Sequence, residues 1–283
     1  MKIMVTGSQG FIGQNLIAYV KRHTNWHVDG WDIADDPDLL FDGYDWIIHL
    51  GANSSTVERD VDSIMRTNYD FSRWLYRRCC EEGINLQYAS SASIYGLASD
   101  FKEDSPPDPR NPYAWSKYLF DRHVEQNPTG KIVVQGFRYF NVYGNHEEHK
   151  GSQASPVTQF RLQARATNTI KLFHNSDHYL RDFICVEDVA WTHIQFIQQV
   201  NNSGIWNVGT GEPVSFKYVA DQIVKLTHAD IEYVDMPAVL KGNYQAYTCA
   251  NTAKLYEAIG PQNWMSIRDW IKVNPDVSRP ISI

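Results

Sequence analysis

The chain has few cysteines and no sequence pattern that would hold a metal. Four cysteines occur among 283 residues: Cys79, Cys80, Cys185 and Cys249. The adjacent pair Cys79 and Cys80 lacks the CxxC spacing of redox and zinc sites, and the ten histidines form no HExxH motif. We therefore expect reduced packing thiols, as in a cytoplasmic protein, and no metal.

Positive charge and long apolar runs are also scarce. The chain has 26 Lys and Arg against 33 Asp and Glu, a formal net charge of -7. A nucleic-acid partner would require a basic stripe for its phosphates, so we expect none. No apolar run approaches the roughly 20 residues of a membrane helix, and the N-terminal MKIMVTGSQGFIG lacks a signal-peptide cleavage site. These absences leave a globular protein of one large or two modest domains.

Short apolar runs alternate with amphipathic stretches in the first half of the chain. We expect strands at residues 2–6, 27–31, 45–50, 86–90 and 132–138, and helices at 10–20, 61–82 and 113–125. Strands that alternate with helices form parallel βαβ units. The pattern therefore predicts an α/β fold with a Rossmann-type, doubly wound parallel sheet.

The pattern loosens after about residue 143. Residues 145–155 are polar and predict a loop, followed by helices at 157–166, 186–199 and 215–227 and a strand at 205–208. We expect a nucleotide-binding Rossmann domain over 1–143, to which 183–210 return. Residues 144–182 and 211–283 then form a smaller, mostly C-terminal substrate lobe.

A glycine-rich turn, Gly7-x-x-Gly10-x-x-Gly13, follows the first predicted strand and opens the first helix. Such a turn lets a pyrophosphate approach the backbone and the helix N-terminus, although glycines also serve ordinary turns. Asp32 ends the second strand, where a carboxylate can bind the ribose hydroxyls of NAD. Because the following IADDPD adds three acidic residues and no basic one, local charge favours NAD over NADP.

A second constellation combines Tyr113 and Lys117 with Ser91. Residues four apart share one helix face, so the phenol and the ammonium of YxxxK lie together. A nearby cation lowers the pKa of a phenol, which predicts that Tyr113 is a usable base near neutral pH. Ser91 follows a predicted strand at the edge of the sheet where ligands bind. The three side chains can polarise a carbinol or a carbonyl.

These motifs together resemble the extended short-chain dehydrogenases/reductases that act on nucleotide sugars. The other matching segments are RYFNVYG at 138–144, RDF at 181–183, VEDVA at 186–190 and NVGTG at 207–211. A narrower similarity, to the ADP-L-glycero-D-manno-heptose 6-epimerase family, rests on GANSST at 51–56, YASSA at 88–92, HKGS at 149–152 and KGNYQA at 241–246.

The resemblance implies an NAD(P)-dependent epimerase that oxidises a sugar carbinol to a ketone and reduces it again on the opposite face. For an ADP-heptose, the reacting centre is C6. The two acid/base groups implied are Tyr113, assisted by Lys117, and Lys150, with Ser91 as their partner. The narrower family prefers NADP, and extended members of this fold often dimerise through two long helices, here 61–82 and 113–125, so we expect a homo-oligomer.

The implied binding residues fall into two sets. Those for the cofactor are Gly7, Gly10, Phe11, Ile12, Gly13, Asp32, Ile33, Leu50, Gly51, Ala52, Ser54, Asn68, Tyr113 and Lys117. Those for the nucleotide-sugar substrate are Ser91, Asn141, Ser152, Gln159, Phe173, Arg181 and Tyr244. Arg181 suits a diphosphate because guanidinium binds phosphate oxygens bidentately, whereas Phe173 could equally be a core aromatic.

Several departures from the narrower family leave alternatives open. The segment between Asp32 and Asp45 is short, so a strand and a helix beside the adenine are expected to be missing. Gln159 stands where that family has a histidine, which leaves C4 chemistry on a UDP- or GDP-hexose possible. A 4,6-dehydratase is disfavoured because Ala92 and Ser93, rather than Asp and Glu, follow Ser91. A non-catalytic dinucleotide-binding sensor is disfavoured because Tyr113 and Lys117 are both present.

Overall fold

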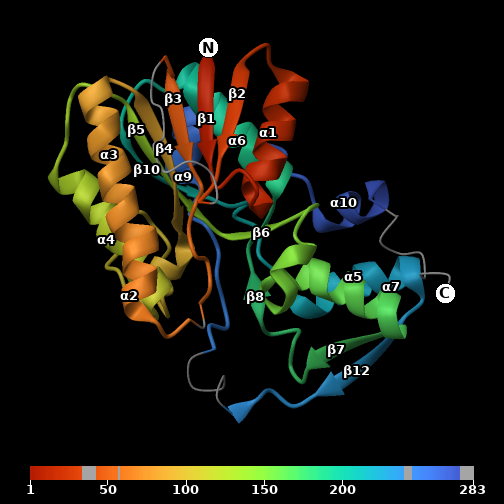
Figure 1. Cartoon of the computed structure of the whole chain (residues 1–283). Helices are drawn as coiled ribbons and strands as arrows, with labels where there is room; N and C mark the ends of the chain where they lie inside the picture. Colours follow the sequence, from red (N-terminus) through yellow and green to blue (C-terminus); the bar gives the residue numbers. More distant parts are fainter. Residues whose placement is uncertain (34–42, 57, 239–243, 275–283) are drawn as a thin grey trace.

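The computed structural model describes residues 1–33, 43–56, 58–238 and 244–274 (Figure 1). Its largest unit is a six-stranded sheet with the order β10-β5-β4-β3-β1-β2, in which every neighbouring pair is parallel. The strands are β1 (Lys2–Thr6), β2 (His27–Trp31), β3 (Trp46–His49), β4 (Asn85–Ser91), β5 (Val134–Tyr139) and β10 (Gly204–Val208). The predicted Rossmann-type parallel sheet is confirmed.

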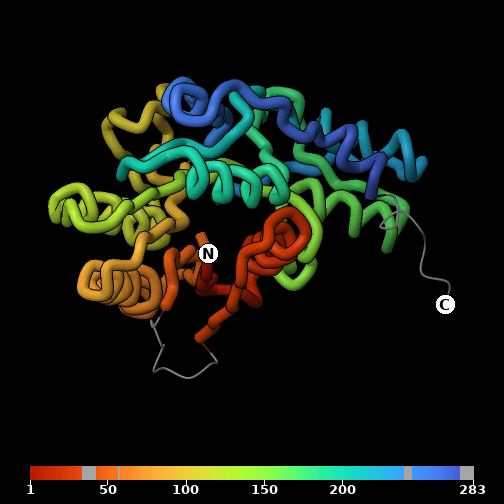
Figure 2. The backbone as a smooth tube through the Cα atoms, turned by 90° about the horizontal axis from the view of Figure 1, so that it is seen from above, coloured from red at the N-terminus to blue at the C-terminus, as the bar shows by residue number. Residues whose placement is uncertain are grey.

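Helices cover both faces of this sheet, because successive side chains of a strand point to opposite faces. In β1, Ile3 and Val5 join one apolar cluster with α1 (Phe11–His23) and α6 (Val186–Gln199). Met4 faces the other way, into a cluster with α3 (Phe71–Glu82) and α4 (Pro112–Gln126). Seen from above in Figure 2, α3 and α4 lie across the sheet from α1. The sheet is thus doubly wound, as predicted.

The predicted helix over residues 61–82 is not uniform. It starts as α2 (Val61–Ile64), continues as a π-helical segment, η1 (Met65–Asp70), and ends as α3 at Gly83, whose φ is 72°. Apolar spacing cannot distinguish a π turn from an α turn, and π segments often mark functional regions.

The sheet ends at β2 within the described residues, since β2 pairs only with β1 there. Residues 34–42, which hold the acidic cluster that favours NAD, lie outside the described part of the chain. The prediction that a strand and a helix are missing between Asp32 and Asp45 concerns mainly this segment and likewise lies outside the described residues.

A smaller lobe packs below the sheet in Figure 1. It contains α5 (Pro156–Thr167), α7 (Phe216–Thr227), α10 (Ile267–Val273) and the parallel pair β7 (Thr169–Phe173) and β12 (Asp230–Val234), around a core that includes Val157, Phe160 and Trp270. Two short pairs, β6 (Asn141–Tyr143) with β9 (Phe183–Cys185) and β8 (Leu180–Arg181) with β11 (Val214–Ser215), lie where the chain passes between the lobes. A further helix, α9 (Ala253–Ile259), contacts β10.

Two short 3-10 helices lie where no helix was predicted: η2 (Ala92–Tyr95) and η3 (Glu148–Gln153). Within η3, Gly151 has a φ of 54°, which breaks the segment into two turns too short to produce an apolar period. The polar segment at 145–155 is therefore ordered, and it contributes directly to the site described below.

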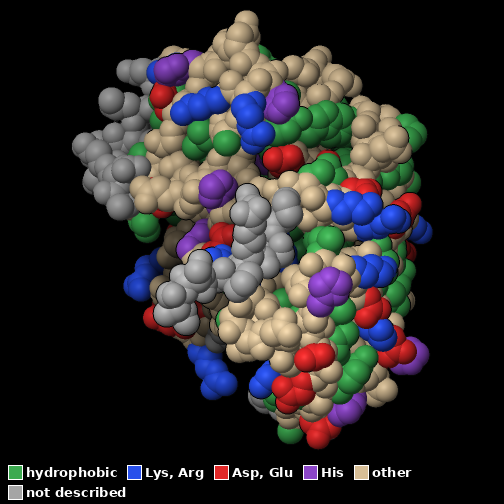
Figure 3. Space-filling model, turned by 90° about the vertical axis from the view of Figure 1, so that its right-hand side faces the viewer, with side chains coloured by type: hydrophobic (Ala, Val, Ile, Leu, Met, Phe, Trp, Pro, Cys, Tyr) green, Lys and Arg blue, Asp and Glu red, His purple; other side chains and the backbone are tan. Residues whose placement is uncertain are grey.

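The described part of the molecule has no helix that is long and apolar enough to cross a membrane. It also has no cluster of three or more His, Cys, Asp or Glu side chains that could hold a metal ion. On the described part of the face shown in Figure 3, basic and acidic side chains are interspersed.

Candidate functional site

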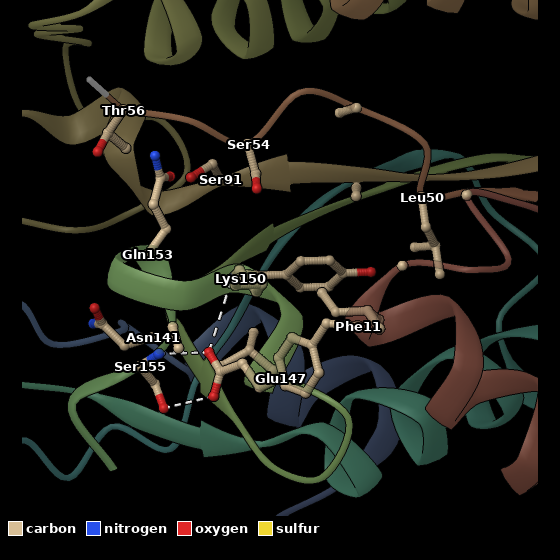
Figure 4. Close-up of a pocket in the computed structure, with 18 of the residues that line it drawn as sticks. Phe11, Leu50, Ser54, Thr56, Ser91, Asn141, Glu147, Lys150, Gln153 and Ser155 are labelled. Carbon is tan, nitrogen blue, oxygen red and sulfur yellow. Dashed lines mark hydrogen bonds and ion pairs between the residues drawn. The ribbon is translucent and has the colours of Figure 1, made fainter. Parts of the chain in front are cut away.

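A cavity of about 480 Å³ lies at the carboxyl ends of the sheet strands, between the sheet and the smaller lobe. Ligands of open α/β sheets bind at this edge. Figure 4 shows Ser54 and Ser91 on one side, Glu147 and Ser155 on the other, and Lys150 between them. The predicted residues that line the cavity are Gly7, Gly10, Phe11, Ile12, Gly13, Leu50, Ala52, Ser54, Ser91, Tyr113, Lys117, Asn141 and Lys150.

The glycine turn has the shape that a dinucleotide requires. Gly7 has a φ of 71°, and its carbonyl accepts the Gly10 N–H at 3.0 Å. A Cβ on Gly13 would lie 2.2 Å from the Gly7 carbonyl oxygen, so only glycine fits there. Gly10 lines the cavity, and the nearest atom to a Cβ there would be the Gly7 carbonyl oxygen, at 3.2 Å. Because glycine has no side chain, this position leaves room for a phosphate. Because no side chain caps α1, its first N–H groups are available to an anion.

Asp32 lies beside this turn, although it does not line the cavity itself. Its two carboxylate oxygens accept hydrogen bonds from the backbone N–H groups of Gln9, at 3.0 Å, and Ile33, at 2.9 Å. The side chain of Ile33 is exposed. Gly51 backs the turn: a Cβ on Gly7 would lie 2.6 Å from the Gly51 Cα.

Asn68, a predicted cofactor residue, is buried in η1 away from the cavity wall. Its side chain accepts the Asn53 N–H at 2.8 Å and donates to the Asn53 carbonyl at 2.9 Å. It also donates to the Ser116 hydroxyl at 3.1 Å. Asn68 therefore ties the segment after β3 to α4, and it lies one layer behind the cavity.

The start of α4 fixes the positions of Tyr113 and Lys117. Asn111 caps the helix by accepting the Ala114 N–H at 2.8 Å, and Pro112 occupies the first turn. Tyr113 thus lies in the first turn and Lys117 one turn later. The Lys117 ammonium donates to the Ala89 carbonyl at 2.8 Å and lies 5.9 Å from the centroid of the Tyr113 ring.

Burial shifts the pKa values of Tyr113 and Lys117 toward their neutral forms, contrary to the sequence prediction for Tyr113. Burial raises the pKa of Tyr113, and the hydrogen bond with Ser91 lowers it only in part. Burial also lowers the pKa of Lys117 to about 8, although the Asp121 carboxylate raises it. The pKa of Tyr113 is therefore raised rather than lowered, because burial disfavours the phenolate.

A buried polar network behind these residues holds α4 on the sheet. The Asp121 carboxylate accepts the Arg138 Nε–H at 2.9 Å and the Ser90 hydroxyl at 3.0 Å. Arg138 also donates to the Tyr95 hydroxyl at 3.0 Å. The RYFNVYG segment therefore contributes Arg138 to the support of the site and Asn141 to the cavity wall.

Lys150 reaches the cavity from η3, in the polar segment of the smaller lobe. Its ammonium lies 5.4 Å from the centroid of the Phe11 ring and 3.8 Å from Glu147 Oε1. Glu147 was not predicted from the sequence, and neither were the cavity residues Gln153 and Ser155. The Ser155-Pro156 start of α5 is a recognisable helix signal, but nothing in the sequence distinguishes Glu147 from Glu148.

A second cavity of about 450 Å³ shares Pro156 with the first and continues into the smaller lobe. Three predicted substrate residues line it: Gln159, Phe173 and Tyr244. The sequence did not predict Ser176, which also lines it: its side chain is 2% exposed, and its hydroxyl has no hydrogen-bond partner in the described part of the chain. Ser152 is exposed and lines neither of these cavities.

Arg181 stands beside the second cavity. Its guanidinium carbon lies 5.4 Å from the ring centroid of Phe216 and 5.3 Å from that of Tyr244, both of which line this cavity. Burial lowers the pKa of Arg181, and the charge of Tyr244 opposes this shift only in part. A partly desolvated guanidinium of this kind is suited to an anionic ligand.

Known proteins resemble this chain in both sequence and fold. Residues 3–209 match the NAD dependent epimerase/dehydratase family. An ADP-L-glycero-D-manno-heptose-6-epimerase of Brachyspira hyodysenteriae is 35% identical over 97% of each chain. The crystal structure of the Helicobacter pylori ADP-L-glycero-D-manno-heptose-6-epimerase matches with a TM-score of 0.86 and 25% identity. The match covers 98% of this chain and 96% of the Helicobacter pylori chain. A UDP-glucose 4-epimerase of Thermotoga maritima with UDP-glucose has a TM-score of 0.84 at 22% identity, with 98% of each chain covered. By the match over residues 3–209 and the 35% identity over nearly the whole chain, this protein belongs to the NAD dependent epimerase/dehydratase family.

Proposed function

We propose that the protein is a nucleotide-sugar epimerase that inverts C6 of an ADP-heptose through a transient ketone. The observation that carries this proposal is that Tyr113 and Lys150 line one cavity from different elements, α4 and η3. Two acid/base groups placed on separate walls suit proton transfer at opposite faces of one carbon. The 35% identity to a heptose epimerase supports the substrate class.

The cofactor of this family is a nicotinamide dinucleotide, and the glycine turn fits its pyrophosphate. When bound, it supplies the acceptor and donor of the hydride. Gly7, Gly10 and Gly13 would hold the pyrophosphate at the N-terminus of α1. Leu50, Ala52 and Ser54 would border the nicotinamide half.

The proposed cofactor is NAD, because the Asp32 carboxylate lies beside the glycine turn, where a 2′-phosphate would be repelled. We expect Asp32→Ala to weaken NAD binding and to reduce the preference over NADP by about tenfold or more. Titration of both dinucleotides by calorimetry measures this. Tighter binding of NADP than of NAD by the unsubstituted protein would contradict the assignment.

The reacting hydroxyl of the sugar would lie against Ser91 and Tyr113. Tyr113 takes its proton on one face, while Lys117, fixed by the Ala89 carbonyl, supplies positive charge beside the phenol. Lys150 transfers the proton on the other face. Rotation about the C5–C6 bond of a heptose exposes that face without movement of the whole sugar.

The rest of the substrate would extend into the second cavity. Phe173 and Tyr244 offer apolar and aromatic walls for a nucleobase, and Gln159 lies at the same wall. Arg181 would bind the diphosphate, and Asn141 and Ser152 would hydrogen-bond the sugar or the phosphates. The substrate thus bridges the Rossmann domain, 1–143 with 183–210, and the lobe formed by the remaining residues.

We also propose a cytoplasmic homo-oligomer. The four cysteines are free thiols, as in a reducing compartment. On α4, Trp115 is 46% exposed and packs edge-to-face against Tyr118. The two rings offer an apolar surface beside α3 for a second copy. Light scattering of the purified protein tests the oligomeric state, and a monomer would contradict it.

The function is tested by incubation with ADP-D-glycero-D-manno-heptose and analysis of the products by NMR. We expect the C6 epimer to form, and we expect Lys150→Ala to abolish its formation. Turnover only of a UDP- or GDP-hexose, retained in Lys150→Ala, would assign C4 chemistry instead. Tight dinucleotide binding without turnover of any nucleotide sugar would indicate a non-catalytic sensor.

A further inference from the structure

Glu147 is a fully buried carboxylate in the wall of the first cavity, with 0% of the residue exposed. Its Oε1 accepts the Ser155 N–H at 2.6 Å. Its Oε2 accepts the hydroxyls of Ser155 and Thr158, both at 2.7 Å. The donors belong to the N-cap residue Ser155 and to the first turn of α5, so Glu147 is anchored to the N-terminus of that helix.

The anchored carboxylate faces Lys150, which is three residues further along the chain. Glu147 Oε1 lies 3.8 Å from the Lys150 ammonium, and the Glu147 carbonyl accepts the Lys150 N–H at 3.0 Å. The Lys150 side chain is 26% exposed, and its ammonium has the Phe11 ring on its other side at 5.4 Å. The ammonium is thus held between the glycine-turn helix and the smaller lobe (Figure 4).

We propose that Glu147 is a positioning residue for Lys150: its charge, anchored to α5, keeps the ammonium directed into the cavity. This inference rests on the proposed role of Lys150 as the second acid/base group. A separation of 3.8 Å is longer than a normal hydrogen bond, so the ammonium is oriented and still free to move toward a substrate. A long, flexible lysine in a largely polar segment would otherwise sample many rotamers.

The charge of Glu147 can be separated from its structural role. In Glu147→Gln, the amide oxygen can still accept the Ser155 N–H, and the amide NH₂ can donate to the Ser155 and Thr158 hydroxyls, which rotate to accept. All three contacts can therefore be retained, two of them with donor and acceptor exchanged, while the charge that attracts the ammonium is removed. Glu148 is an exposed neighbour in η3, so Glu148→Gln is a matched control.

The experiment compares Glu147→Gln, Glu148→Gln and Lys150→Ala with the unsubstituted enzyme, each with both C6 epimers of the ADP-heptose as substrate. We expect Glu147→Gln to lower kcat by roughly 10- to 100-fold, the loss expected from a misplaced group. The KM and the melting temperature should stay close to those of Glu148→Gln. Reduced nicotinamide, followed by its near-ultraviolet absorbance, should still form from the epimer that Tyr113 deprotonates and should form more slowly from the other.

The outcomes separate the inference from the proposed function. Near-normal kcat in Glu147→Gln, with Lys150→Ala inactive, overturns the positioning role and leaves the two-base mechanism intact. Equally slowed formation of reduced nicotinamide from both epimers, accompanied by a lower melting temperature, also overturns it, because Glu147 would then only hold η3 against α5. Full turnover in Lys150→Ala overturns the proposed function itself, and the inference with it.

Discussion

The Lys117 ammonium donates a hydrogen bond of 2.8 Å to the carbonyl oxygen of Ala89, two residues before Ser91 on β4. This contact joins the two elements that carry the predicted catalytic side chains, α4 and β4. It also places a positive charge in a site where Lys117 is only 6% exposed. The enzyme therefore keeps a charge where burial disfavours it, which indicates a functional rather than a stabilising role.

The first prediction follows from that burial. In the unfolded chain Lys117 has its ordinary pKa of 10.5, and burial lowers the pKa to about 8 in the folded protein. Between these two values the unfolded state binds more protons, so this group makes the free energy of unfolding rise with pH. At neutral pH, below both values, it costs up to ~3 kcal/mol.

We expect Lys117→Met to have a higher free energy of unfolding than the unsubstituted protein at about pH 7, with turnover lowered ~100-fold or more. The stability difference should shrink as the pH rises from about 8 to about 10. Urea titrations across this range measure it, with the exposed Lys131→Met as control. A constant difference would show that Lys117 is not desolvated.

The second prediction separates two glycines of the turn. A Cβ on Gly13 would collide with the Gly7 carbonyl oxygen at 2.2 Å, whereas a Cβ on Gly10 would lie 3.2 Å from that oxygen, in the cavity wall where we expect a phosphate. We expect Gly13→Ala to lower both stability and dinucleotide affinity. Gly10→Ala should fold with nearly normal stability and bind dinucleotide about tenfold or more weakly. Thermal melting and calorimetric titration distinguish them, and equal effects in both assays would contradict the prediction.

The sequence was sufficient to predict the elements marked by short apolar runs or by helical apolar spacing. The runs at residues 2–6 and 27–31 match β1 and β2 at both ends, and the apolar spacing at 186–199 matches α6. The glycine turn and the YxxxK motif also predicted site residues correctly placed at the cavity, because each lies within a single βα unit or a single helix. Local spacing alone then determines how its residues lie relative to one another.

Features that depend on contacts distant in the chain could not be predicted. The pair β7 and β12 joins segments about 60 residues apart, and Asp230–Val234 is a short, mostly exposed strand. Glu147 and Glu148 are identical neighbours, and only the packing of α5 buries one and leaves the other exposed. The pKa of Tyr113 depends on how deeply the site is buried, which spacing does not reveal.

The third prediction concerns Arg181, which lies between two aromatic rings of the second cavity. Arg181→Met keeps much of the apolar contact and removes the charge. We expect the KM for a nucleoside-diphosphate sugar to rise roughly 10- to 100-fold, as for the loss of a charge-assisted hydrogen-bonded pair, while kcat changes little. Steady-state kinetics with the ADP-heptose measure both, and inhibition by ADP should weaken in parallel. A fall in kcat at constant KM would place Arg181 nearer the chemistry than proposed.

The last prediction concerns the Ser176 hydroxyl, which is buried at the wall of the second cavity without a partner in the described residues. An unsatisfied buried hydroxyl costs about 1–3 kcal/mol in the free protein, so we expect Ser176→Ala to be as stable as the unsubstituted protein or more stable. If the hydroxyl instead bonds the nucleotide, the variant should bind ADP about 2- to 10-fold more weakly, the range of one hydrogen bond. Calorimetric titration with ADP and thermal melting test both effects.

Ser155→Ala provides the contrast. The Ser155 hydroxyl already donates to Glu147 at 2.7 Å, so its removal should lower the stability of the protein. A destabilised Ser176→Ala with unchanged ADP affinity would show that the hydroxyl has a structural partner, and the nucleotide would then have to be recognised by other groups of this cavity.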